Sequence, residues 1–366
     1  MALFLFLLCS GLFHFAFTSQ RLRILYFPKG DTGVAWNESL VNCALENGSP
    51  VTLYDQEDAD FTSKFLKSEL SRQKPLWLGL NKRQRNHTWS DGVNVSFSKS
   101  SVNETEGKPI CEAIDNNTWT GHNCSEEKYF MCSNGSSYTL ITEEKSWCQA
   151  LKHCRTYYKD LVSILNEIQN DEVIGKGHNT SFWIGLLHDD WKWHDNGCSS
   201  YRDWMKKTQS HSIEEEKHCT VYQGAQLNQM SCTRDAKTGF CSKGTMRIIV
   251  INKNLTWEGA FDYCQKHHSG PLWIEDEGDQ KAVEQWLTHS NVNGSFWIAL
   301  RQTHVFGFWI WRDSQVCYNN WKDGTVPVPP SSNLCGVIDK TENYKWRDEE
   351  CLLEHPFLCE EEIVIL

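Results

Sequence analysis

Apolar residues recur at helical spacing at the start of three similar segments of the chain. In the last segment, Trp257, Phe261 and Cys264 lie at positions i, i+4 and i+7, which places them on one face of a helix. Thr256, directly before them, is a suitable N-cap. The same spacing of Trp and Cys occurs at two earlier places: Trp36 with Cys43 and Trp147 with Cys154. The pattern predicts three helices that each carry a cysteine toward a protein core.

Further helical and extended segments follow these helices. Helical spacing predicts a second helix over 276–290 in the last segment and over 58–70 in the first. Apolar strings and closing apolar segments predict strands. The strings are Trp77–Leu80, Trp183–Leu186 and Trp297–Leu300, and the closing segments are Tyr129–Cys132, Gly239–Cys241 and Pro356–Cys359. Two helices that lead into short strands and a long polar loop indicate the α+β class.

The helix, the string and the closing segment occur three times in the same order, about 110 residues apart. Each repeat ends with three cysteines: Cys111, Cys124 and Cys132; Cys219, Cys232 and Cys241; Cys335, Cys351 and Cys359. A period this long indicates whole domains, because solenoid units repeat every 20 to 50 residues. We expect three domains, over 24–133, 137–242 and 246–360.

The N-terminus indicates export. The first 18 residues are apolar and end in small residues, and Arg21 is the first charge, so we expect a secretory signal peptide over 1–19, which removes Cys9. The apolar Ile363–Leu366 is far shorter than the roughly 20 residues that cross a bilayer. The sequence therefore predicts a secreted, extracellular protein without a membrane span.

N-glycosylation sequons agree with export. We expect glycans at Asn37, Asn86, Asn94, Asn103, Asn116, Asn134, Asn179, Asn254 and Asn293. Asn47, near Pro50, and Asn123, beside Cys124, are weaker candidates. The formal net charge of -11 argues against a nucleic acid or an anionic membrane as partner, because both require clustered Lys and Arg.

Motifs for catalysis are missing from the sequence. The 14 His residues form no HExxH, and neither a GxSxG elbow nor a glycine-rich phosphate loop occurs. Zinc is disfavoured as well, since no close-spaced cysteine pair faces a second pair and an oxidising compartment favours disulfides. We expect no catalytic residues, no enzyme activity and no cofactor, with Ca²⁺ as the remaining candidate.

All three repeats resemble C-type lectin-like domains, because Trp, Cys, apolar string and cysteine triplet occur together in order. The tandem array is similar to the mannose receptor and secretory phospholipase receptor group, without its membrane anchor. The resemblance implies a disulfide-stapled double-loop fold, with an outer pair from first helix to last strand and an inner pair at the long loop. The implied pairs are Cys43–Cys132, Cys111–Cys124, Cys154–Cys241, Cys219–Cys232, Cys264–Cys359 and Cys335–Cys351, with Cys148–Cys198 as an additional pair.

Without Cys9 the chain has an odd number of cysteines, so one must be free or paired between chains. Cys317 occupies the place that corresponds to Cys198, but Glu258 stands where the partner Cys148 would be. We therefore expect Cys317 to be unpaired within the chain. The hypothesis is a disulfide-linked partner or second copy through Cys317, and the alternative is a buried, inert thiol.

The family's Ca²⁺ and sugar site uses oxygen ligands from a triplet in the long loop and from a Trp-Asn-Asp triplet before the fourth cysteine. In the first, second and third repeats, the second triplet is Trp119–Gly121, Leu227–Gln229 and Trp346–Asp348, respectively. Only Asn228 and Asp348 remain as weak remnants of a metal site. Arg347 also places a positive charge at a ligand position. The long loops offer only Asn103–Glu106, Ile213–Glu216 and Val326–Pro330. We expect no metal site of the usual kind.

Three interpretations of function follow. The leading one is a secreted lectin-like protein that binds a glycan or protein ligand without the usual Ca²⁺-dependent site. The second is a Ca²⁺-dependent carbohydrate-binding lectin with substitute ligands such as Asn228 or Asp348, or a soluble form of a multi-lectin-domain endocytic receptor. The third is a glycosylated structural spacer. Stacking of a sugar on Trp309 or Trp311 is a minor hypothesis.

Overall fold

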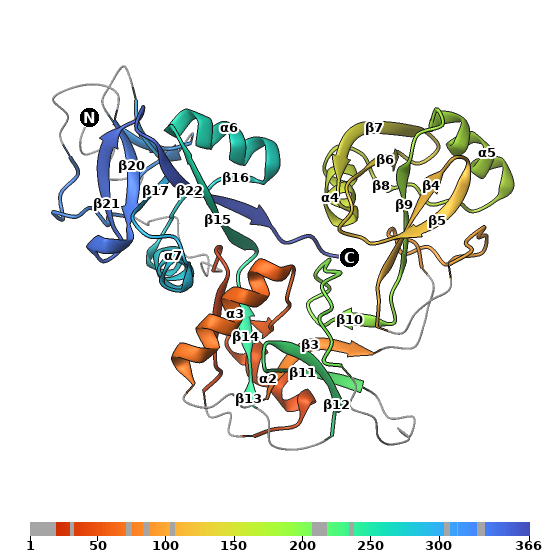
Figure 1. Ribbon diagram of the computed structural model, residues 1–366, viewed down its shortest axis with the longest axis horizontal. Helices are drawn as coiled ribbons and strands as arrows, with labels where there is room; N and C mark the ends of the chain where they lie inside the picture. Colours follow the sequence, from red (N-terminus) through yellow and green to blue (C-terminus); the bar gives the residue numbers. More distant parts are fainter. Residues whose placement is uncertain are drawn as a thin grey trace. The chain divides into compact units, whose positions relative to one another are not determined.

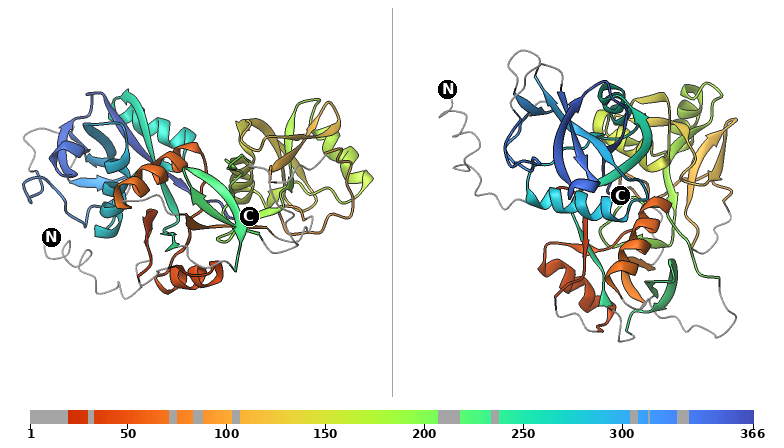
Figure 2. Two further views of the ribbon diagram at one scale, coloured as in Figure 1. Left: turned by 60° about the horizontal axis from the view of Figure 1, so that its bottom comes forward. Right: turned by 60° about the vertical axis from the view of Figure 1, so that its left-hand side comes forward.

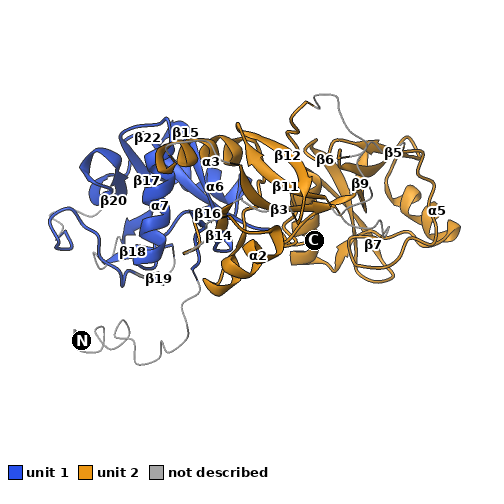
Figure 3. Cartoon of the chain, turned by 90° about the horizontal axis from the view of Figure 1, so that it is seen from below, with its two compact units in different colours: residues 1–26, 242–363 blue, residues 27–241, 364–366 orange. Residues whose placement is uncertain are grey.

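The computed structural model describes most of the chain as two compact units (Figure 3). The described residues are 20–29, 33–70, 75–82, 88–102, 107–206, 218–233, 238–303, 308–312, 314–327 and 334–366. Unit 1 holds the described residues up to Tyr26 together with Ser242–Ile363, and unit 2 holds those of Phe27–Cys241 together with Val364–Leu366. Within the described part of the chain, no helix is long and apolar enough to cross a membrane.

Unit 1 contains the third repeat. Its helices are α6 (Trp257–His267), α7 (Glu277–His289) and the 3₁₀ helix η1 (Lys340–Glu342). Its strands are β1 (Ile24–Tyr26), β15 (Met246–Leu255), β16 (Gly270–Pro271), β17 (Ser295–Gln302), β18 (Trp309–Trp311), β19 (Ser314–Gln315), β20 (Leu334–Asp339), β21 (Lys345–Glu350) and β22 (His355–Glu362). The sheet has the order β15-β22-β17-β18-β19, and β20 pairs with both β17 and β21 (Figure 1).

Two tryptophans join the first helix of this repeat to its central strand. The indole nitrogen of Trp257 on α6 donates to the carbonyl of Ile298, at 2.8 Å. The indole nitrogen of Trp297 on β17 donates back to the carbonyl of Leu255, at 2.9 Å. Both rings are buried, so these bonds satisfy donors that would otherwise be costly in the core. The predicted helix start is confirmed, because the Thr256 side chain accepts a hydrogen bond from the Gly259 amide.

Unit 2 contains the first two repeats. Its helices are α2 (Trp36–Leu45), α3 (Gln56–Glu69), α4 (Trp147–Tyr157) and α5 (Glu167–Lys176). Its strands are β2 (Ser49–Pro50), β3 (Leu76–Lys82), β4 (Ile110–Asp115), β5 (Thr118–His122), β6 (Lys128–Ser133), β7 (Tyr138–Lys145), β8 (Asp160–Leu161), β9 (Phe182–His188), β10 (Trp191–Trp193), β11 (His218–Gln223), β12 (Gln226–Ser231) and β13 (Thr238–Gly239); β14 (Cys241–Lys243) continues into unit 1.

The strands of unit 2 pair across the repeat boundary. One sheet has the order β10-β3-β11-β12, with β13 also on β3, so a strand of the first repeat lies among strands of the second. The other sheet has the order β5-β4-β9-β6-β7, where β9 of the second repeat lies between strands of the first. We call residues 88–188 the inner fold, and residues 33–82 with 191–241 the outer fold. The inner fold, with the order β7-β6-β9-β4-β5, has the strand pairing of β15-β22-β17-β20-β21 in the third repeat. In the outer fold, β3, β11 and β12 pair as β17, β20 and β21 do, while β1 and β2 pair with β14 in a separate three-stranded sheet. Both folds are thus built from two half-repeats, and the course of the chain can be followed in Figures 1 and 2.

Backbone hydrogen bonds show the same exchange. In the third repeat, the amide of Trp257 donates to the carbonyl of Cys351, at 3.0 Å. The corresponding amides in unit 2 donate across repeats: Trp36 to Cys232 at 3.2 Å, and Trp147 to Cys124 at 3.0 Å. Each half-repeat therefore satisfies the same backbone groups as the third repeat does, with the complementary half taken from the other repeat.

Two of the expected disulfides are wrong for this reason. The structure joins Cys43 to Cys241 and Cys132 to Cys154, in place of Cys43–Cys132 and Cys154–Cys241. The exchange places the first helix of each repeat beside the last strand of the other, so the outer cysteines meet across repeats. The other five expected pairs are present: Cys111–Cys124, Cys148–Cys198, Cys219–Cys232, Cys264–Cys359 and Cys335–Cys351.

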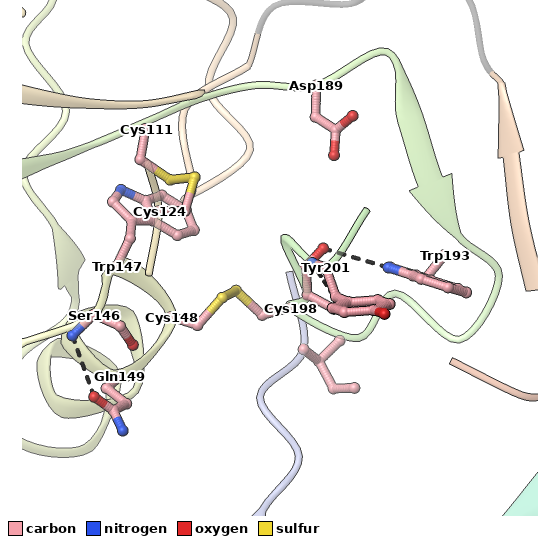
Figure 4. The surroundings of a disulfide bond; sticks show 12 residues. Cys111, Cys124, Ser146, Trp147, Cys148, Gln149, Asp189, Trp193, Cys198 and Tyr201 are labelled. Atoms are coloured by element: carbon pink, nitrogen blue, oxygen red, sulfur yellow. Dashed lines mark hydrogen bonds between the residues drawn. A yellow bond between two sulfur atoms is a disulfide. The ribbon is translucent and has the colours of Figure 1, made fainter. Parts of the chain in front are cut away.

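The additional pair connects the two folds of unit 2. Cys148 lies on α4 of the inner fold, directly after Trp147, and Cys198 follows β10 of the outer fold (Figure 4). Cys198 packs in the same cluster as Cys111, Cys124 and Trp147, with Val364 against it. The capping box at Ser146 fixes the start of α4 and hence the position of Cys148.

The expectation of an unpaired Cys317 is also wrong. Its side chain is disulfide-bonded in the structure, and none of the described cysteines is free.

Candidate functional site

The strands that carry the second triplet of each repeat occupy equivalent places in the three folds. Each is the second strand of a hairpin: β5 pairs with β4, β12 with β11 and β21 with β20. In register, Gly121 lies opposite Glu112, Asn228 opposite Val221, and Asp348 opposite Gly336. The resemblance to C-type lectin-like domains implies a sugar site at these three hairpins.

In the fold of the third repeat, which we call the third fold, the positively charged side chain of Arg347 occupies the middle position of the triplet. The guanidinium of Arg347 contacts Asp339 at 3.3 Å and donates to the Ser295 hydroxyl at 3.0 Å, and it also pairs with Glu349. Burial alone would raise the pKa of Asp339, but hydrogen bonds from Thr341 and Ser295 and the charge of Arg347 hold that pKa below its usual range. A fixed positive charge among carboxylates disfavours a second cation at this place.

In the inner fold, the equivalent strand has no room for a ligand side chain. A Cβ atom added at Gly121 would lie 2.4 Å from Cγ2 of Val102 and 2.6 Å from Cγ2 of Ile110. Val102 belongs to the long loop, which here packs directly on the strand. An Asp or Asn at this position would require that loop to move.

Neighbouring polar groups of β4 and β5 bond to one another. The Asp115 carboxylate accepts from Thr120 and contacts the His122 ring, whose Nε2 also lies 3.0 Å from the Thr120 hydroxyl. Burial would raise the pKa of Asp115, but hydrogen bonds from Ser181, Thr120 and His122 lower it. These side chains support the hairpin and offer no cluster of free oxygens.

In the outer fold, the long loop covers the strand through backbone bonds. The Leu227 amide donates to the Asp203 carbonyl at 2.8 Å, and the Met205 amide donates to the Leu227 carbonyl at 2.8 Å. Leu227 is buried, and Asn228 is half-buried beside it. Asn228 and Asp348, the two predicted remnants, belong to different folds. No group of three or more His, Cys, Asp or Glu able to hold a metal occurs among the residues that the structure describes.

The aromatic residues of the third long loop form its internal support. Trp309 packs edge-on against Trp321 with ring centroids 4.7 Å apart, and Trp311 packs edge-on against Trp346 at 5.2 Å. All four indoles are buried. The hypothesis that Trp309 or Trp311 presents a flat face to a sugar is therefore wrong.

Two apolar side chains on this support remain exposed. Phe308 and Val326 each expose 49% of their surface, and they adjoin Trp309 and Pro327, which are themselves joined by a hydrogen bond from the Trp309 indole to the Pro327 carbonyl at 3.3 Å. Two hydrogen bonds with Thr303 hold Phe308 in place: the Thr303 amide donates to the Phe308 carbonyl at 2.8 Å, and the Phe308 amide donates to the Thr303 hydroxyl at 3.1 Å. The sequence analysis missed both residues, because their exposure depends on which neighbouring aromatics turn inward.

The predicted glycosylation sites lie where glycans can be attached. Each sequon asparagine that the structure describes is exposed: Asn37, Asn47, Asn94, Asn116, Asn123, Asn134, Asn179, Asn254 and Asn293. Asn86 and Asn103 lie outside the described residues. The long-loop segments 103–106 and 213–216, and residues 328–330 of the third such segment, lie outside them as well.

Helix, central strand, hairpin and paired disulfides define three double-loop α+β folds of lectin type. Comparison with known families agrees: residues 32–134, 143–243 and 253–361 match the lectin C-type domain. The chain belongs to the C-type lectin domain family.

Several relatives are named as receptors. The chain is 21% identical to the bovine secretory phospholipase A2 receptor over 391 residues, which cover 83% of this chain and 26% of the receptor. It is 20% identical to the rat C-type mannose receptor 2, covering 89% of this chain and 28% of that one. It is 30% identical to C-type lectin 1 of Hydrophis hardwickii over 110 residues, 29% of this chain and 67% of that protein. The chain thus spans about a quarter of the length of the receptors it matches.

Among solved structures, human lithostathine aligns with a TM-score of 0.30 at 23% identity, covering 32% of this chain and 84% of that chain. A calcium-independent type II antifreeze protein aligns with a TM-score of 0.28 at 23% identity, covering 33% and 89%.

Proposed function

We propose that the chain is a secreted, extracellular glycoprotein that binds a glycan or protein ligand without Ca²⁺ at the usual sugar position, and that it is not an enzyme. The observation that carries this proposal is the ion-paired Arg347, which stands within the hairpin where the family places an oxygen ligand. The packing of Val102 on Gly121 supports it in the inner fold. The exposed sequon asparagines are consistent with glycosylation.

We place the ligand contact of the third fold at Phe308 and Val326. Exposed apolar side chains on a rigid aromatic base lose little entropy when a partner covers them, and aromatic residues are enriched at binding hot spots. The surface next to them is polar, with Asn319 and Asp323 exposed. This combination suits a protein face or the apolar face of a sugar ring.

The test is a binding screen with the full chain in Ca²⁺ and again in EDTA. The names of the relatives make mannose and a secreted phospholipase A2 the first ligands to include. We expect the same ligands to bind with equal strength in both conditions. Retention on mannose that EDTA releases would contradict the proposal and favour a Ca²⁺-dependent lectin, and a screen without any ligand would favour a structural spacer.

A matched pair of variants tests the surface. Phe308→Ser should weaken binding of the identified ligand by roughly tenfold or more, as expected for truncation of a hot-spot aromatic. Leu352→Ser is the control, because Leu352 is even more exposed but lies in the turn between β21 and β22. Equal binding by both variants would remove Phe308 from the ligand contact without affecting the Ca²⁺ result.

A further inference from the structure

Residues 20–25 form an extended segment, which we call the N-terminal strap, within unit 1. Leu22 and Leu25 are fully or almost fully buried against the third repeat. The strap pairs with the start of β15: the amides of Thr245 and Met246 donate to the Arg21 carbonyl at 2.9 and 3.0 Å. A segment far away in the sequence thus becomes part of the third lectin fold.

The side chains of α7 bind the backbone of the strap. Gln285 uses its amide twice on Leu25, accepting from the backbone amide at 2.9 Å and donating to the carbonyl at 2.8 Å. The indole of Trp286 donates to the Arg23 carbonyl at 3.3 Å, and the Asp279 carboxylate accepts from the Leu22 amide at 2.9 Å. When a protein recognises an extended peptide, hydrogen bonds to the peptide main chain give affinity and pockets for its side chains give specificity.

Arg21 supplies the sequence-specific contact. Its guanidinium pairs with Asp279 at 3.1 Å and with Glu360 at 2.6 Å, and both carboxylates are almost fully buried. It also donates to the Trp273 carbonyl and lies over the Trp273 ring, 4.2 Å from the centroid. A planar guanidinium satisfies two carboxylates and a ring at once, which an ammonium does not.

The path of the strap is fixed by close backbone approach at Gly244. This residue has φ of 114°, which disfavours other residues, and an added Cβ would lie 2.6 Å from the Leu22 carbonyl oxygen. A larger residue here would push the strap away from β15. The groove is shaped for this segment by β15, α7 and the end of β22, and residues Ile24 and Leu25 of the strap also belong to β1, which pairs with β14.

From these contacts we infer that the third lectin-like domain contains a peptide-binding groove, separate from the long-loop residues Phe308 and Val326. Its resident ligand is the chain's own strap. The groove recognises Arg21 and the apolar residues Leu22 and Leu25, which follow it at the first and fourth positions. Because the strap belongs to the same chain, its binding is intramolecular, so the strap excludes free peptides of similar sequence. The inference does not depend on the proposed ligand of the long loop.

The first test uses single substitutions in the full chain. Arg21→Ala should lower the melting temperature of unit 1 by roughly 5 °C or more and speed hydrogen exchange in α7, because Asp279 and Glu360 lose the cation that they share. Arg21→Lys should recover only part of the loss. Lys29→Ala is the control, since Lys29 is exposed and follows the strap. Exchange in α7 equal to that of Lys29→Ala would overturn the inference.

The second test adds the peptide in trans. A chain that lacks residues 20–25 should bind a labelled synthetic peptide of residues 20–27 saturably and with one-to-one stoichiometry, whereas the intact chain should not. A peptide with Arg21→Ala should bind at least tenfold more weakly, and a scrambled peptide should not bind. If the shortened chain folds, as judged by its circular dichroism, and ignores the peptide, or binds the scrambled peptide equally, the groove is not a recognition site. If it does not fold, the exchange result for Arg21→Ala decides.

Discussion

The backbone amide of Trp147 donates to the carbonyl of Cys124 at 3.0 Å, although the two residues belong to different sequence repeats. The third repeat makes the equivalent bond within itself, from Trp257 to Cys351 at the same distance. A half-repeat of this chain therefore makes the same backbone contact with the complementary half of its own repeat or of another repeat. Which half it meets is decided by the connections between the halves.

The exchange predicts a specific disulfide map. Non-reducing digestion followed by mass spectrometry should join the peptide of Cys43 to that of Cys241, and the peptide of Cys132 to that of Cys154. The double variant Cys43→Ala/Cys241→Ala should be secreted with the other disulfides intact, because it removes both partners of one disulfide. Cys43→Ala/Cys132→Ala should instead leave Cys154 and Cys241 without partners. Peptides that join Cys43 to Cys132 would rule out the exchange.

Loop entropy does not choose between the two pairings. In the chain-entropy model, the observed loops, with separations of 198 and 22 residues, restrict the unfolded state by about 5 and 3.5 kcal/mol. The alternative loops, each about 90 residues long, give about 4.5 kcal/mol each. These sums are equal within the accuracy of the model, so the choice must come from the crossover segments.

At the crossover, Asp190 contacts both folds of unit 2. It lies two residues after the end of β9. Its carboxylate lies 3.8 Å from the ammonium of Lys82 in the outer fold and accepts from the Gly107 amide in the inner fold at 3.3 Å. Next to it, Asp189 pairs with the buried Arg202 at 2.5 Å. Burial raises the pKa of Asp189, and the charge of Arg202 opposes that rise.

The local sequence was sufficient to predict the helices and strands, but not which strands and helices pack together. The spacing of Trp257, Phe261 and Cys264 predicts α6, and the apolar strings predict β3, β9 and β17, because these signals depend on neighbours within one element. The exchange could not be predicted, since the first two repeats present the same Trp and Cys at the same contact. Phe308 and Val326 could not be identified either, because side-chain exposure is a property of the packed loop.

Gly121→Ala should destabilise unit 2 by about 1–3 kcal/mol, the usual cost of overpacking, because the new methyl group meets Val102 and Ile110. Denaturant unfolding of the full chain, followed by near-UV circular dichroism, measures the change. Gly175→Ala is the matched control: this glycine lies in α5 with nothing within 4 Å of its added Cβ, so stability should stay the same or increase slightly. Equal stability of the two variants would show that the long loop is not packed on β5.

Arg347→Ala should destabilise unit 1 by about 1 kcal/mol, since a third of the side chain is solvent-exposed and its ion pairs are partly screened. The loss should shrink at high salt, because exposed charge pairs are screened by ions. Lys281→Ala, which breaks the exposed pair with Glu277, is the control and should leave the melting temperature unchanged. A loss for Arg347→Ala that is the same in 0.05 and 1 M salt would contradict an electrostatic role.

The stability of unit 1 should depend on pH through Asp339. Its pKa in the folded state is held below the value of the unfolded chain by Thr341, Ser295 and Arg347, against the opposing effect of burial. The folded state then binds fewer protons than the unfolded state, so this stabilisation is complete above about pH 4 and is lost as pH falls through the lower folded pKa. Asp339→Asn should be less stable than wild type at pH 7 and should lose less free energy of unfolding between pH 5 and pH 3. Asp262→Asn, at an exposed position on α6, should keep the wild-type slope. If Asp339→Asn also keeps that slope, the carboxylate of Asp339 does not stabilise the hairpin, and Arg347 is held by its other partners.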